Sequence, residues 1–290
     1  PVPLCRAAGE EMCKLYIYFI FTCRARWYAS LPLCTKLKTE PWLGGYDGDD
    51  ETPMEISRPS LGLYITATYP DSTTFKDVLN RTRGIVDFYE IGIPTSNPKY
   101  DGPIIRMTHF KSQLKGLEAV KVASYEKSIL MGYIDDYVDS LDAVAEVAAQ
   151  VGASAILFPD LLFDHFDKLD DYVKAMRSHG LDTAFFVSSK TPHKIIEKVA
   201  SLEPLFIYLG LYASTGTKLP VYIERNVSIV RKLVGDTYLV TGFAVRDAGM
   251  VRALIEAGAN GVVVGTAFIE RMGNLDEAMQ FLRELRGGLP

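Results

Sequence analysis

Cysteine and tryptophan are absent from most of the chain. The four cysteines lie between Cys5 and Cys34, both tryptophans (Trp27 and Trp42) share that stretch, and all four histidines lie outside it. A cysteine-based disulfide or metal module is therefore conceivable only near the N-terminus, where no two cysteines stand in a C-x-x-C pair. This clustering indicates a break in composition near Met54.

Three further observations each exclude a class of protein. No apolar run approaches the roughly 20 residues that a membrane-spanning helix needs. The net charge of -5 lacks the positive excess that is typical of nucleic-acid-binding proteins. With 48% hydrophobic residues, the chain is not disordered as a whole. We therefore expect a globular protein that binds neither membrane nor nucleic acid, with 290 residues forming one large domain or two small ones.

Residues 1–53 allow three interpretations. A signal peptide starting at Met12 would use the apolar run Leu15–Cys23, but two arginines follow that run closely and fit poorly with a cleavage region. A four-cysteine metal or disulfide module is the second interpretation. The third, which we favour, is a disordered or non-native extension, with the folded domain at residues 54–290.

From Met54 onward, short apolar runs alternate with longer amphipathic ones. The expected strands are Leu61–Thr66, Val86–Ile91, Ser128–Met131, Ala155–Phe158, Thr183–Val187, Leu205–Leu209, Thr237–Val240 and Gly261–Val264. The expected helices include Leu141–Val151, His165–His179, Thr191–Ser201, Arg246–Ala257 and Asn274–Arg286. Continuous apolar strands are typical of a parallel sheet that is buried on both faces. The alternation predicts an α/β fold, a single (β/α)8 TIM barrel. A doubly wound open sheet is the alternative, weakened because no G-x-G-x-x-G follows the first strand.

The loop after the second expected strand carries the most unusual polar residues. In TIM barrels the active site lies on the loops that follow the strands. Glu90 comes near the end of its strand, and Asp101 follows eleven residues later in a loop that holds three prolines. Partial burial at the barrel mouth can raise the pKa of such a carboxyl group. The two resemble an acid/base pair, although a strand-end Glu and a loop-capping Asp would give the same pattern.

Glycines also follow the last two expected strands. Gly242 and Gly265 would let backbone N–H groups approach an anion closely. A short helix starting at Thr266 would add its positive N-terminal end. Barrels frequently bind a phosphate at this place, so we expect a phosphate site there rather than two turns without a ligand.

The residues from Glu90 to Pro103 closely resemble the signature of the tryptophan synthase alpha subunit family. Further collinear matches extend the resemblance from about Leu61 to the C-terminus, and they are Leu130-Met131-x-Tyr133, Pro159-Asp160-Leu161, Thr215-Gly216, Gly242-Phe243 and Gly265-Thr266-Ala267. The long motif is specific to that family, whereas the glycine turns are shared by many phosphate-binding barrels. The first 53 residues match nothing in that family.

The resemblance implies a carbon–carbon lyase. That family cleaves indole-3-glycerol phosphate to indole and glyceraldehyde 3-phosphate in tryptophan biosynthesis, a retro-aldol step that uses no metal and no organic cofactor. By position, Glu90 matches the general acid/base, Asp101 matches the carboxylate that binds the indole N–H, and Tyr133 matches an active-site tyrosine. The expected substrate-binding residues are Tyr64, Gly216, Gly242, Phe243, Ala244, Gly265 and Thr266. The resemblance also implies a cytoplasmic protein and a heterotetramer with a tryptophan synthase beta-type subunit.

Three departures from the family pattern bear on activity and on coupling to the partner. Ala244 stands where the family usually has a second glycine, Leu211 holds the position of a loop arginine, and Asn97 replaces a frequent aspartate. These changes motivate an alternative function, a weakly catalytic alpha-like subunit that activates a beta-type synthase. Another phosphate-binding barrel is a third interpretation, but it would not explain the long motif. We expect His109 and His193 to be surface or helix-end histidines.

Overall fold

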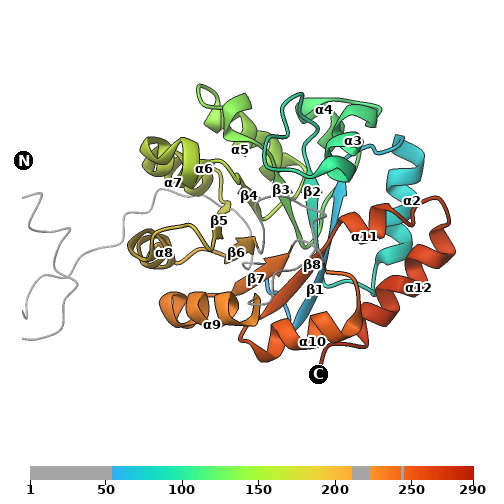
Figure 1. Cartoon of the computed structure of the whole chain (residues 1–290). Helices are drawn as coiled ribbons and strands as arrows, with labels where there is room; N and C mark the ends of the chain where they lie inside the picture. Colours follow the sequence, from blue (N-terminus) through green and yellow to red (C-terminus); the bar gives the residue numbers. More distant parts are fainter. Residues whose placement is uncertain (1–53, 211–222, 243–244) are drawn as a thin grey trace, which may run out of the picture. The chain divides into compact units, whose positions relative to one another are not determined.

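Eight short, almost entirely buried strands close into a parallel barrel in the computed structural model, which describes residues 54–210, 223–242 and 245–290 (Figure 1). The strands are β1 (Ser60–Thr66), β2 (Phe88–Gly92), β3 (Ser128–Met131), β4 (Ala155–Leu157), β5 (Asp182–Ser188), β6 (Phe206–Gly210), β7 (Leu239–Gly242) and β8 (Gly261–Val264). Each strand pairs with its neighbours in chain order, and β1 pairs with β8. The sheet therefore has no free edge, which confirms the TIM barrel and excludes the open sheet.

Helices surround the strands on the outside of the barrel (Figure 1). The helical segments are α2 (Ser72–Thr82), α3 (Pro103–Lys111), α4 (Gly116–Val120), η1 (Ile134–Asp136), α5 (Leu141–Gln150), α6 (Leu161–Asp164), η2 (Phe166–Lys168), α7 (Leu169–Ser178), α8 (His193–Ala200), α9 (Ile223–Val234), α10 (Ala248–Glu256), α11 (Thr266–Ile269) and α12 (Leu275–Arg286). Their apolar stripes face the strands, so one continuous core fills the space between the two layers. Among the described residues, no helix has the length and apolarity to span a membrane.

The expected elements agree with the structure except in their bounds. All eight expected strands overlap an observed one, but the second and the seventh begin two residues later than expected, because turns at Gly84 and Gly235 with positive φ precede them. The expected helix His165–His179 is divided into η2 and α7. Residues 1–53, the expected extension, lie outside the described residues, so their structure stays a prediction.

The strand register sets which side chains share the interior of the barrel. Tyr64 on β1 pairs with Glu90 on β2, and paired residues of parallel strands project to the same face. A Cβ atom at Gly92 would lie 2.4 Å from the Tyr64 hydroxyl oxygen, so only glycine leaves room for that hydroxyl. The register therefore delivers Tyr64 and Glu90 together to the carboxyl ends of the strands, where barrel active sites lie.

Candidate active site

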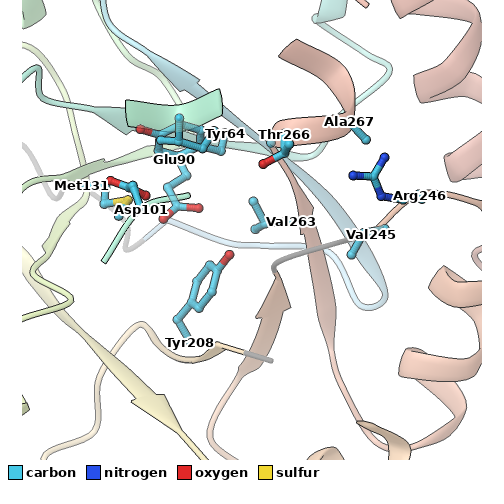
Figure 2. Close-up of a pocket in the computed structure, with 12 residues that line it drawn as sticks. Tyr64, Glu90, Asp101, Met131, Tyr208, Val245, Arg246, Val263, Thr266 and Ala267 are labelled. Atoms are coloured by element: carbon cyan, nitrogen blue, oxygen red, sulfur yellow. The ribbon is translucent and has the colours of Figure 1, made fainter. Parts of the chain in front are cut away.

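A cavity opens at the carboxyl ends of the strands and is lined by five of the predicted site residues. It encloses about 450 Å³ of empty space, open solvent at its mouth included, and the five predicted residues that line it are Tyr64, Glu90, Asp101, Gly265 and Thr266. Figure 2 shows Glu90, Asp101 and Met131 on one side of the cavity and Val245 and Arg246 on the other. The two carboxyl groups and the guanidinium group thus face one space from different directions.

Glu90 is a buried carboxyl group with a raised pKa. Its side chain leaves the sheet from β2 into the barrel, and the residue is only 3% exposed. Burial, and secondarily the neighbouring negative charge of Asp101, raises the pKa of Glu90 to about 8. Glu90 is therefore protonated at neutral pH and can give up its proton to a bound molecule.

The raised pKa predicts a pH dependence of stability. Glu90 has an ordinary pKa of 4.5 when unfolded and about 8 when folded, so between these values the unfolded chain loses a proton that the folded protein keeps. As the pH rises through this window, we expect the free energy of unfolding of the wild type to fall by a few kcal/mol relative to that of a Glu90→Gln variant. The size follows from the pKa difference, at on the order of 1.4 kcal/mol per pKa unit. Urea unfolding of both proteins at several pH values measures the difference. The exposed Glu197→Gln variant is the matched control and should follow the wild type.

Asp101 is held in place through its backbone and its side chain. Its amide N–H donates to the carbonyl oxygen of Pro98 at 3.1 Å, and its own carbonyl accepts from Nε of Arg106 at 2.7 Å. The hydroxyl of Tyr133 donates to Oδ2 of Asp101 at 2.8 Å. Tyr133 is fully buried and lies behind Asp101, so it orients the carboxylate rather than reaching into the cavity.

The opposite end of the cavity is built from residues at the end of β8 and directly after it, and from Val245 and Arg246. Gly265 and Thr266, at the start of α11, line it together with Arg246, whose guanidinium also contacts Glu270 at 3.2 Å. A cation, a hydroxyl and a glycine backbone together suit a multiply charged anion such as a phosphate. Gly216, Phe243, Ala244 and the divergent Leu211 lie outside the described residues.

Gly242 contributes to the site in a way that the strand pattern did not indicate. A Cβ atom there would lie 1.8 Å from the hydroxyl oxygen of Tyr208 on β6, so the absence of a side chain gives that ring its position. Figure 2 shows the Tyr208 hydroxyl pointing into the cavity. Gly242 therefore shapes the cavity by admitting Tyr208, and its contact with a phosphate stays a prediction.

Comparisons with known proteins decide the family. The sequence model described as tryptophan synthase alpha chain matches residues 52–287. The tryptophan synthase alpha chain of Saccharolobus solfataricus is 33% identical over 242 residues, which cover 80% of this chain and 97% of that protein. That of Sulfurisphaera tokodaii is 31% identical, covering 79% and 97%. The chain belongs to the tryptophan synthase alpha chain family.

Solved structures of the family agree with this assignment. A structure of the tryptophan synthase a2b2 complex from the hyperthermophile Pyrococcus furiosus aligns with a TM-score of 0.71 at 25% identity, and the alignment covers 80% of this chain and 100% of the other. A mutant alpha subunit from the same organism aligns equally well at 27% identity. The family model begins at residue 52, so it includes the whole of the described barrel up to residue 287.

The prediction for His109 was right about the end of a helix, since it lies in the last turn of α3, but wrong about the surface. This histidine is 2% exposed and lies on the inner face of α3, where its Nε2 is 3.4 Å from Oδ2 of Asp101. The sequence contained a signal for this burial, because His109 follows Ile105 by four residues and Thr108 by one. These three residues form the buried stripe of the helix. Arg246 and Tyr208 were also missed as cavity residues in this tryptophan synthase alpha chain homologue.

A group of acidic residues beside the site contains its own cation. Asp135, Asp160 and His165 lie close enough together to be considered as metal ligands. However, the ammonium of Lys99 lies 2.7 Å from Asp135 and 3.2 Å from Asp160. Asp160 also accepts the backbone N–H of Ile134 at 2.9 Å. The group is therefore an ion-pair network that fastens the loop after β2 to the loops after β3 and β4.

Proposed function

We propose that this chain cleaves indole-3-glycerol phosphate to indole and glyceraldehyde 3-phosphate. The observation that carries the proposal is the pair of buried carboxyl groups, Glu90 and Asp101, which line one cavity at the mouth of a barrel of the tryptophan synthase alpha chain family. Their environments differ, and two carboxyl groups in different environments can divide acid and base roles. We assign the acid/base role to Glu90 and the charge-stabilising role to Asp101.

The reaction needs one proton delivered and one removed. Glu90, protonated at neutral pH, gives its proton to the ring carbon C3 of the indole, which becomes a cationic indolenine. The resulting carboxylate then takes the proton of the glycerol hydroxyl next to the ring, and that oxygen forms the carbonyl of glyceraldehyde 3-phosphate. The electron pair of the broken carbon–carbon bond returns to the ring, which leaves as indole. One carboxyl group of raised pKa can thus serve both transfers in sequence.

Asp101 stabilises the charge that develops on the ring. Its carboxylate accepts the indole N–H, which becomes more acidic as C3 is protonated, so the attraction strengthens toward the transition state. The Tyr133 hydroxyl fixes the carboxylate in the orientation that this contact needs. Tyr64 lies beside Glu90 in register and supplies an aromatic wall for the ring.

The phosphate occupies the opposite end of the cavity in this proposal. Gly265, Thr266 and Arg246 line that end, and we assign further phosphate contacts to the residues predicted from the sequence, Gly216, Gly242, Phe243 and Ala244. Binding energy from this remote group orients the indole end against Glu90 and Asp101. The guanidinium of Arg246 adds a charge at this end of the cavity, although the family's loop arginine is replaced by Leu211.

We further propose that the protein is cytoplasmic and assembles with a tryptophan synthase beta-type subunit into a heterotetramer. The Pyrococcus furiosus relative forms an a2b2 complex, which supports the assembly. Asn97, exposed in the loop after β2, stands where the family frequently has an aspartate that signals to the beta subunit. The proposal therefore includes the partner but leaves the strength of activation to measurement.

The test is indole release from indole-3-glycerol phosphate by the full chain and by residues 54–290, each with and without a beta-type subunit. We expect turnover by both forms, because the family match begins at residue 52, and an increase when the partner is added. Turnover that ignores the partner would indicate a stand-alone lyase. No turnover, combined with a higher activity of the partner itself, would favour the regulatory alternative.

A further inference from the structure

His109 is a buried histidine whose two ring nitrogens both face polar groups of the site. The backbone N–H of Thr95 donates to Nδ1 at 3.1 Å. On the other side of the ring, Nε2 lies 3.3 Å from the hydroxyl oxygen of Tyr64 and 3.4 Å from Oδ2 of Asp101. The ring therefore connects the loop after β2 with two side chains that line the cavity.

The hydrogen bonds around the ring determine where its proton lies. Because Nδ1 accepts the Thr95 N–H, the proton of the neutral ring is on Nε2. This nitrogen is therefore a donor, and it points toward Tyr64 and Asp101. An ionised carboxylate has only acceptor atoms, so the Asp101 carboxylate can face the N–H donor of His109 without any conflict between two donors.

A chain of hydroxyl groups fixes the Tyr64 side of the contact as well. Thr108 donates its single proton to the carbonyl of Ile105 at 2.7 Å, so its oxygen accepts from Thr66 at 2.5 Å. Since the proton of Thr66 is used there, its oxygen accepts from the hydroxyl of Tyr64 at 3.2 Å. The oxygen of Tyr64 then accepts from Nε2 of His109 at 3.3 Å. Each group in this series donates to the next, from His109 through Tyr64 to the backbone of α3.

We propose that His109 is a positioning residue for the lyase reaction, holding the Asp101 carboxylate and the Tyr64 ring in the orientation that binds the indole. The role rests on the proposed function, since it acts through Asp101. Tyr133 and His109 both approach the same oxygen, Oδ2. The second oxygen, Oδ1, is the one we assign to the indole N–H. Neither the family resemblance nor the expected surface position of His109 indicated this role.

Two substitutions separate the donor from the acceptor. In His109→Gln the side-chain amide reaches the place of Nε2, so it keeps a donor toward Asp101 and Tyr64 but loses the acceptor for the Thr95 N–H. In His109→Asn the amide reaches the place of Nδ1, so it keeps that acceptor and loses the donor. Each variant gives up one buried hydrogen bond, so the two should lose similar stability. The exposed His193→Asn is the control for a histidine outside the site.

The experiment measures kcat and KM for indole release and the urea unfolding midpoint of each protein. We expect His109→Asn to lower kcat on the order of tenfold, because it removes the donor that is hydrogen-bonded to the Tyr64 hydroxyl and faces the Asp101 carboxylate, and His109→Gln to stay within a few-fold of the wild type. A kcat of His109→Asn equal to that of the wild type would overturn the positioning role. So would equal losses in both variants, because a merely structural histidine predicts no rescue by Gln.

Nuclear magnetic resonance of the imidazole nitrogens tests the geometry without any turnover. The resonances of His109 are identified as those of the 15N-labelled wild type that are absent from His109→Gln. We expect them to show the tautomer that is protonated on Nε2 only. A ring protonated on Nδ1 would overturn the proposal whatever the kinetics show. Absence of indole release by the wild type would overturn the proposed function itself and the positioning role with it, whereas normal release with no effect of His109→Asn overturns the positioning role alone.

Discussion

Replacing Glu90 by Gln is expected to lower kcat for indole release by roughly 10²–10⁴-fold, the usual contribution of a positioned acid/base group. Gln has nearly the same size and fills the same buried place on β2, but it can neither deliver a proton to the ring carbon nor take one from the glycerol hydroxyl. KM should change little, since the groups at the phosphate end of the cavity are untouched. Steady-state kinetics with purified substrate measure both constants.

The pH profile gives this prediction a second readout. The proton-delivering form of Glu90 is lost as the pH rises through about 8, so kcat/KM of the wild type should fall above that value. The residual activity of Glu90→Gln should not show this limb. Glu197→Gln, which changes an exposed glutamate on α8, should keep both the rate and the limb. A Glu90→Gln variant with wild-type turnover would remove Glu90 from the mechanism.

The barrel was predictable because each of its strands is an uninterrupted apolar run. Val262–Val264 in β8 illustrates this: all three residues are buried, and no polar alternation was there to suggest an exposed face. Closure follows from the number of strand–helix units rather than from any single residue. The bounds were less predictable, as in β7, because a turn such as that at Gly235 depends on φ, which an apolar pattern does not reveal.

The site was predictable where chemistry is concentrated in a short stretch and unpredictable where it depends on packing. Glu90 and Asp101 are separated by one proline-rich loop, so their meeting in one cavity is a local event. His109 meets Tyr64 across 45 residues, and that contact depends on the rotation of α3 about its axis. Arg246 belongs to the cavity because a long side chain reaches back from beyond β7.

The second large effect is expected for Asp101→Asn. Asn keeps the volume of the side chain and can still accept a hydrogen bond from the Tyr133 hydroxyl. However, the substitution removes the negative charge that stabilises the cationic indolenine. We expect kcat to fall on the order of 10²-fold, comparable to the loss of one electrostatic stabiliser of a transition state. KM should rise as well, since the same carboxylate accepts the indole N–H in the ground state. The control is Asp170→Asn, an exposed aspartate on α7.

The coupling between the two carboxyl groups makes this variant more informative than a rate alone. The charge of Asp101 is one cause of the raised pKa of Glu90, after burial. Removing that charge lowers the pKa of Glu90, so the alkaline limb of kcat/KM should move to lower pH in Asp101→Asn. A variant that is slow but keeps the wild-type limb would mean that the two groups do not share one cavity during the reaction. A slow variant with a displaced limb requires that Asp101 acts both on the substrate and on the acidity of Glu90, which is the arrangement the geometry supports.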